Sequence, residues 1–168
     1  MASAVQWSSY NFVTPILTIV NFLVLLPTAL GSWAKTTTTW DFVLVGIGVW
    51  LALRFVRNFQ DAHRFPQTRM WPGKVDKIVR EGVYAKKRQP VISAVIYMNL
   101  SYVFLFRSFA LLAIVPFFVV TWYVLAWYFD GLLEQKFGDE YRAYRTRTGL
   151  VRAGEGFDEW SSSGFKVN

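Results

Sequence analysis

Long apolar stretches separate the polar segments of this chain, and their lengths predict membrane-spanning helices. Residues 11–30 form the first stretch, which matches the roughly 20 apolar residues needed to cross a bilayer, and no charge occurs between Met1 and Ala34. We interpret it as a membrane helix rather than a secretory signal peptide, because no basic segment precedes it. A second span is predicted over residues 38–55, with Trp40 and Arg54 in the two interfaces.

The third apolar stretch predicts a helical hairpin. It covers residues 91–129 and contains a single charge, Arg107, near its middle. Such a stretch is too long for one membrane helix, and an arginine at the centre of a bilayer is costly. We therefore expect spans over residues 91–106 and 109–129, joined by a tight turn at Arg107 and Ser108. The chain is thus predicted to be one all-α polytopic membrane domain with about four transmembrane helices.

The polar segments carry two further helical patterns. In the basic loop of residues 56–90, Val75, Ile78 and Val79 recur at helical spacing before Gly82. They predict a short amphipathic helix over residues 74–81 on the membrane surface, acting either as an entry gate or as a connector. In the C-terminal segment of residues 130–168, a second amphipathic helix is predicted up to about residue 148, followed by a tail that we expect to be held in place. Its apolar positions are Leu132, Leu133, Phe137, Tyr141 and Tyr144.

The distribution of charge gives the spans an orientation. The chain has 18 lysines and arginines against 11 acidic residues, for a net charge of +7, and most cations lie in the basic loop and the C-terminal segment. The positive-inside rule then places both termini and the loop on the cytoplasmic, matrix or stromal side. It also predicts anionic lipids as partners, with headgroup contacts at Lys74, Lys77, Lys86 and Lys87. No zinc-finger spacing or basic–aromatic sheet pattern accompanies this charge, so no nucleic-acid binding is expected.

Few residues suit metal or nucleophilic chemistry. The chain has no cysteine, which excludes disulfides, thiolate ligands and cysteine nucleophiles. Its single histidine, His63, lies near Asp61, but residues this close in sequence do not face one another on a helix. We predict no metal site and an interfacial or structural role for His63.

Two patterns within the spans leave alternatives open. The first span contains polar groups that need partners in lipid: the backbone carbonyls freed by Pro15 and Pro27, and the side-chain amide of Asn21. They indicate either packing against protein or a kinked peripheral helix. Aromatic residues near the inner end of the last span indicate either an interfacial belt or a ring-lined cofactor pocket. These residues are Trp122, Tyr123, Trp127 and Tyr128.

An ordered set of motifs surrounds the hairpin. Gly82-x-Tyr84-x-x-x-Arg88-x-Pro90 precedes it, and Leu133, Phe137-Gly138 and Tyr141-x-x-Tyr144 follow it. Over about residues 78–152 this frame resembles the isoprenylcysteine carboxyl methyltransferase-like group, which also includes phospholipid methyltransferase-like membrane proteins. The resemblance implies an S-adenosylmethionine pocket at the inner membrane face. The cofactor-binding residues it implies are Tyr84, Arg88, Gln89, Asp130, Glu134, Tyr141 and Tyr144.

Several positions depart from the pattern of that group. Its Arg-His-Pro is replaced by Arg88-Gln89-Pro90, and glutamine cannot take up a proton near neutral pH as histidine can. The paired glutamates seven and eight residues before the Phe-Gly are replaced by Asp130 and Phe129. A tyrosine after the proline is replaced by Ile92, and a later Pro-Arg by Gly149-Leu150. The residues of the frame are therefore retained, whereas several polar residues that would contact the cofactor are replaced.

These departures decide the expected function. We expect a non-catalytic, methyltransferase-like subunit that serves as a structural or accessory component of a larger membrane assembly, with other membrane subunits as partners and no favoured cofactor. An organelle inner membrane is favoured over the endoplasmic reticulum. The alternative is an active S-adenosylmethionine-dependent methyltransferase acting on a lipid or prenylated substrate. No catalytic residue is assigned in either case.

Overall fold

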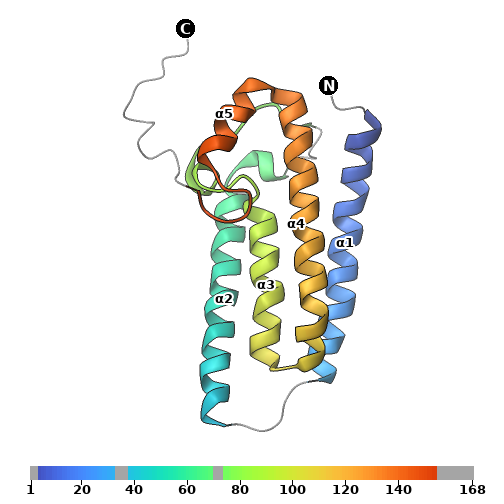
Figure 1. Ribbon diagram of the computed structural model, residues 1–168, viewed down its shortest axis with the longest axis vertical. Coiled ribbons are helices and arrows are strands. Elements are labelled where there is room, and N and C mark those ends of the chain that lie inside the picture. Colours follow the sequence, from blue (N-terminus) through green and yellow to red (C-terminus); the bar gives the residue numbers. More distant parts are fainter. Residues whose placement is uncertain (1–3, 33–37, 70–73, 155–168) are drawn as a thin grey trace.

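Helices account for the regular structure in the computed structural model, which describes residues 4–32, 38–69 and 74–154. The long helices are α1 (Ala4–Gly31), α2 (Thr39–His63), α3 (Pro90–Phe106) and α4 (Phe109–Phe137), followed by the short α5 (Asp139–Arg147). The 3₁₀ turns η1 (Pro66–Arg69) and η3 (Gly82–Ala85) lie between α2 and α3. The four long helices run side by side, and α5 folds across one end of them (Figure 1). The expectation of an all-α polytopic protein is confirmed.

Three of these helices are long and apolar enough to cross a membrane: Phe12–Gly31 of α1, all of α2 and all of α4. The remaining predicted span, over residues 91–106, corresponds to α3, which is apolar but has only 17 residues. At 1.5 Å per residue it is about 26 Å long, slightly less than the hydrocarbon thickness of a typical bilayer. It lies between α2 and α4, and both neighbours extend beyond it (Figure 1).

The turn between α3 and α4 confirms the predicted hairpin. Arg107 adopts the left-handed conformation (φ 50°), and the Ser108 hydroxyl caps α4 by accepting the Leu111 backbone N–H. The Arg107 guanidinium forms an ion pair with Asp41 of α2 at 3.7 Å, and both side chains are largely buried. Ser108 also forms a hydrogen bond with Ser32 after α1, with the two hydroxyl oxygens 2.6 Å apart. These contacts join all four long helices at the end opposite the basic loop.

Two asparagines satisfy each other inside the bundle. Asn21 of α1 and Asn99 of α3 donate their amides to one another at 3.0 and 2.8 Å, and the Trp122 indole of α4 donates to Asn21 Oδ1 at 3.1 Å. Both asparagines are buried, so in lipid these groups depend on protein partners. The first span therefore packs against protein, as one of our two alternatives held, and the partner is the same chain. α1 continues through Pro15 and Pro27.

The predicted amphipathic helix over residues 74–81 is wrong. No α-helix forms there: residue 74 is in a 3₁₀ turn, residues 75–81 are irregular, and Gly82 (φ +57°) opens the 3₁₀ turn η3 instead of ending a helix. Tertiary contacts override the local helical pattern, because Ile78 packs against a buried cluster of Ala85, Leu133, Tyr141 and Tyr144. The Val75 carbonyl also accepts a hydrogen bond from Lys136 of α4 at 2.5 Å.

The boundary between the last span and the C-terminal helix also differs from the prediction. α4 continues past residue 129 to Phe137, and the chain then turns at Gly138, whose φ of +59° suits glycine. The segment after α5 closes against the start of α3, where the Arg88 and Gln89 amides donate to the Gly149 and Leu150 carbonyls at 2.9 Å. The predicted anchoring of the tail concerns residues 155–168, which lie outside the described residues.

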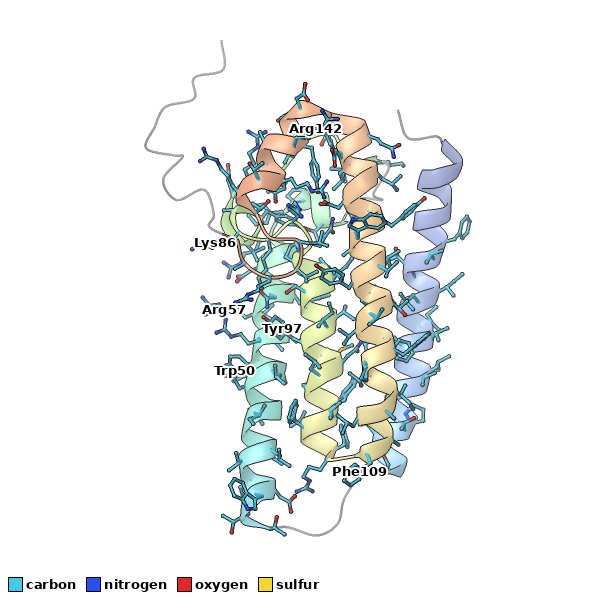
Figure 2. The ribbon with its side chains drawn as sticks, in the orientation of Figure 1. Trp50, Arg57, Lys86, Tyr97, Phe109 and Arg142 are labelled. Carbon is cyan, nitrogen blue, oxygen red and sulfur yellow. The ribbon has the colours of Figure 1, made fainter. Side chains whose placement is uncertain are left out.

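The outer surface divides into apolar and basic zones. Large apolar side chains on α1, α2 and α4 are exposed along the length of the bundle, as expected for faces in contact with lipid. Arg57, Lys86 and Arg142 lie toward the end that carries the basic loop and α5, whereas Phe109 lies at the other end (Figure 2). The helix ends therefore reproduce the charge asymmetry of the sequence.

Candidate functional site

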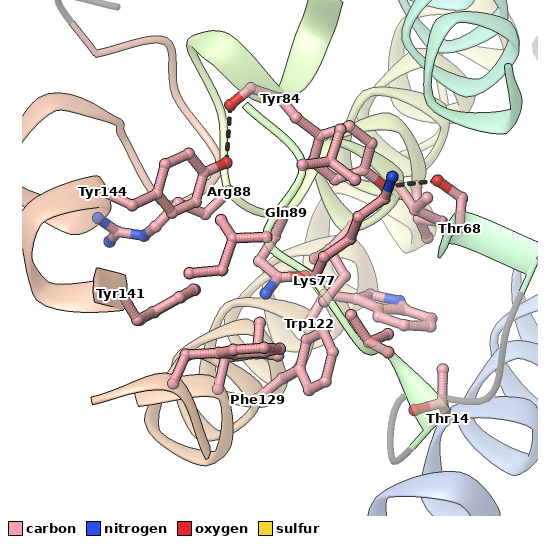
Figure 3. Close-up of a pocket in the computed structure, with 18 of the residues that line it drawn as sticks. Thr14, Thr68, Lys77, Tyr84, Arg88, Gln89, Trp122, Phe129, Tyr141 and Tyr144 are labelled. Atoms are coloured by element: carbon pink, nitrogen blue, oxygen red, sulfur yellow. Dashed lines mark hydrogen bonds between the residues drawn. The ribbon is translucent and has the colours of Figure 1, made fainter. Parts of the chain in front are cut away.

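A cavity of about 360 Å³ lies at the basic end of the bundle. Its walls come from α1, the irregular segment 75–79, and the facing sides of α3 and α4, and the start of α5 covers it. Most of the lining is apolar, including Ile92, Val95, Trp122, Phe129 and Leu133. Tyr141 and Tyr144 lie on one side of the space and Thr14 on the other (Figure 3).

Five of the seven implied cofactor residues line this cavity. They are Tyr84, Arg88, Gln89, Tyr141 and Tyr144. Segments far apart in the sequence thus meet around one cavity. Backbone hydrogen bonds between residues 86–89 and 149–154, which we call the clasp, bring α5 onto the start of α3. The two implied carboxylates, Asp130 and Glu134, are not part of the lining.

Asp130 lies behind the cavity wall within a network of its own. Its carboxylate is 2.8 Å from Arg88 Nε and 3.6 Å from Arg145 Nε, and it accepts the Tyr141 hydroxyl at 2.5 Å. Only 2% of the Asp130 side chain and 9% of the Arg88 side chain are exposed. Arg88 Nη1 also donates to the carbonyls of Arg145 and Thr148, both at 2.7 Å. The network joins α4, α5 and the segment before α3.

Glu134 is held in the same way one turn further along α4. Arg145 Nη1 and Arg142 Nε donate to its two oxygens at 2.6 and 3.1 Å. Arg142 additionally pairs with Asp139 at 2.9 Å. Three arginines therefore neutralise both carboxylates that the resemblance assigned to the cofactor.

The tyrosines support the cavity wall through hydrogen bonds. The Tyr144 hydroxyl donates to the Tyr84 carbonyl at 2.7 Å, and the Tyr84 and Thr68 hydroxyls are 2.6 Å apart. Burial raises the pKa of both tyrosines above their usual value, and it does the same to Tyr141, where the nearby Asp130 charge adds to the effect. The three phenols are therefore neutral hydrogen-bond donors at physiological pH.

Two polar side chains of the lining make no hydrogen bond within the described part of the chain. Gln89 is 6% exposed, and its Nε2 is buried without a partner. Lys77, on the segment 75–79, is exposed and lines the cavity, with its ammonium group on the side that carries Thr68 (Figure 3). An unsatisfied buried amide is unusual in proteins, and it commonly marks a place for a ligand or an ordered water.

The four lysines predicted to contact lipid headgroups lie in different surroundings. Lys74 is exposed at the start of the irregular segment, and Lys77 lines the cavity. The Lys87 side chain lies between α2 and α3, and its ammonium donates hydrogen bonds to Asn58 of α2 and Ser93 of α3, both at 3.2 Å. Burial, followed by the nearby Arg54 charge, lowers the pKa of Lys87. Lys86 lies at the outer side of the clasp, near the basic end (Figure 2).

Other sequence predictions are also resolved by the structure. Trp122 is buried in the cavity wall, whereas Tyr123, Trp127 and Tyr128 are exposed on α4. His63 stacks on Phe59 with ring centroids 4.0 Å apart. No group of three potential metal ligands occurs among the described residues.

Some lining residues were missed by the sequence analysis. These are Thr14, Pro15 and Thr18 of α1 and Thr68 of η1. No local pattern marks them, because they reach the cavity only through the packing of α1 and of the loop after α2.

Neither protein-family models, nor curated proteins, nor solved structures gave a match to this chain. Fold and site together define a polytopic α-helical membrane protein with an apolar cavity at its basic end.

Proposed function

We propose that the chain is a non-catalytic, methyltransferase-like membrane protein whose cavity holds an amphipathic, lipid-like molecule. The single observation that supports this most is the pairing of both candidate cofactor carboxylates with arginines, beside a cavity whose lining is mainly apolar. An apolar cavity with a few polar groups at one end suits a molecule with a hydrocarbon body and a polar head.

S-adenosylmethionine fits these residues poorly. Its ammonium group needs a carboxylate and its sulfonium is positive, but Asp130 is enclosed by Arg88 and Arg145, and Glu134 by Arg142 and Arg145. Among the described lining residues the charge without a counter-ion is that of Lys77, which repels a cation. Opening the Asp130 network would leave buried Arg88 without its counter-ion, which is strongly unfavourable.

Mass spectrometry and calorimetry on the full chain test this proposal. The protein purified in mild detergent is expected to retain lipid, and Val95→Trp, which fills the cavity wall, is expected to reduce the lipid retained. Leu112→Trp is the matched control, because Leu112 is exposed on α4 away from the cavity. Retention that Val95→Trp leaves unchanged would contradict the lipid-binding role.

An active methyltransferase for a lipid or prenylated substrate is the competing function. It is favoured by the meeting of five implied cofactor residues around one cavity. Titration with S-adenosylmethionine separates the two functions, since our proposal expects no heat of binding even at millimolar cofactor. A saturable signal abolished by Arg88→Ala would favour the enzyme.

The wider role we propose is that of an accessory component in a larger membrane assembly, with the basic end on the cytoplasmic, matrix or stromal side. The three helices long enough to span a bilayer support the membrane location, and the lysines and arginines of the basic loop support this orientation. An organelle inner membrane is the proposed location. Co-migration of the native chain with other membrane subunits is expected, and labelling of Lys74 from the opposite side of a sealed vesicle would reverse the orientation.

A further inference from the structure

We infer that Arg54 and Lys87 form a binding site for the phosphate of an anionic phospholipid on the outer surface of α2 and α3. Neither residue lines the cavity, so the site is separate from the proposed cavity ligand. Headgroup contacts were predicted at four lysines of the basic loop. The site contains one of them, Lys87, together with Arg54, which was predicted to lie in the membrane interface.

The Lys87 ammonium is held between α2 and α3 without a negative partner. Its Nζ donates to Asn58 Oδ1 of α2 and to Ser93 Oγ of α3, both at 3.2 Å, and lies 5.4 Å from the centre of the Tyr97 ring. The backbone of Lys87 is fixed by the clasp, where it pairs with Gly149. Both acceptor oxygens are neutral, so the ammonium has hydrogen bonds while its charge stays uncompensated.

Arg54 places a second positive charge beside the first. Asn58 joins the two cations, because its amide donates to the Arg54 carbonyl at 2.9 Å while its Oδ1 accepts from Lys87. Burial is the main cause that lowers the pKa of Lys87, and the charge of Arg54 adds to it, so the two charges act on one another.

A bound anion would relieve this repulsion. Neither Arg54 nor Lys87 forms an ion pair with a carboxylate of the described residues. Two neighbouring cations without a counter-ion repel each other, most strongly where water is partly excluded. A phosphate bound beside both would accept charge-assisted hydrogen bonds from the guanidinium and the ammonium.

The site lies at the depth where the headgroup region begins. Residues 42–53 of α2 are uncharged, and Arg54 is the first cation after them. The Arg54 guanidinium is 5.0 Å from the centre of the Trp50 ring. Trp50 and Tyr97 lie between the basic end, marked by Lys86, and the opposite end of the bundle (Figure 2). Tryptophan and tyrosine favour the membrane interface, which agrees with this depth.

The surroundings of the site suit a lipid better than a free anion. Arg54 is exposed and Lys87 is half-buried, so a ligand can reach the cations from outside the bundle. Val49, Trp50 and Leu53 are exposed on the turns of α2 that precede Arg54. An acyl chain gains apolar contact with these side chains while its phosphate stays at the cations, a contribution that inorganic phosphate lacks.

The test measures lipid binding to the full chain by native mass spectrometry. Detergent-solubilised protein is titrated separately with phosphatidylglycerol and with phosphatidylcholine, and the ratio of the two affinities is the readout. One cation near an anionic headgroup contributes about fivefold, so Arg54→Gln and Lys87→Gln should each lower the preference for phosphatidylglycerol by about that factor. Arg54→Gln decides the test if Lys87→Gln fails to fold, because Arg54 is exposed.

Arg57→Gln is the matched control, because Arg57 is exposed on the same helix and pairs with Asp61. It should keep the preference, and an equal loss in Arg54→Gln and Arg57→Gln would overturn the inference by showing general surface attraction. Equal binding of the two lipids by the wild type would overturn it as well.

Two further measurements separate this site from the cavity and from a free anion. Val95→Trp, which fills the cavity wall, should keep the preference for phosphatidylglycerol. A preference that Val95→Trp abolishes and Arg54→Gln retains would place the anionic lipid in the cavity, which overturns this inference and leaves the proposed function intact. Inorganic phosphate should not compete with the lipid, and competition at millimolar concentration would replace the lipid site by a free-anion site.

Discussion

The strongest structural prediction concerns the buried charge of Asp130. Asp130→Asn keeps the size of the side chain and an oxygen that can accept the Tyr141 hydroxyl, so it removes little more than the negative charge. Arg88, 9% exposed and 2.8 Å from that carboxylate, would then be a buried cation without a counter-ion. Breaking a buried pair in this way costs about 3–5 kcal/mol. We expect the lower end of that range, because Arg88 keeps two backbone carbonyl acceptors.

The assay is unfolding of the purified chain in mixed micelles, followed by circular dichroism. Asp139→Asn is the matched control, since Asp139 also pairs with an arginine but its side chain is 95% exposed. Exposed pairs contribute about 0–1 kcal/mol, so this variant should unfold almost like the wild type. A loss for Asp130→Asn no larger than that for Asp139→Asn would refute the claim that the buried pair of Asp130 and Arg88 stabilises the bundle.

Three further outcomes follow from the fold. Asn99→Leu should destabilise the bundle by about 1–2 kcal/mol in the same unfolding assay, because it leaves Asn21 short of its partner; Gln60→Leu, at an exposed amide of α2, is the control. Gly138→Ala should cost about 1–2 kcal/mol, since nothing crowds the added methyl and only the positive φ is strained; an unchanged midpoint would contradict this. The buried tyrosines favour their neutral forms, so the stability they give is complete below their usual pKa near 10 and is lost as pH rises above it. The midpoint should therefore fall above pH 10, and less steeply in Tyr144→Phe.

The sequence by itself determined the all-α architecture and the hairpin. Uncharged stretches of sufficient length leave few alternatives in lipid, where backbone groups must be satisfied within helices. A single Arg107 in the third stretch was enough to place the turn, because an unpaired arginine is costly at the centre of a bilayer. Five of the residues that the family resemblance implied, on the motifs around the hairpin, line one cavity.

Only the tertiary structure decided how these residues are used. The α-helix predicted for residues 74–81 does not form, because Ile78 packs against the buried cluster that contains the tyrosines of α5. The pairing of Asp130 with Arg88 and Arg145 depends on the fold of α5 back onto α4, which no local pattern reports. The same packing leaves the Gln89 amide buried without a hydrogen bond to any described residue. Local periodicity selects helices because it acts within a few residues, whereas a binding site depends on contacts between segments distant in the chain.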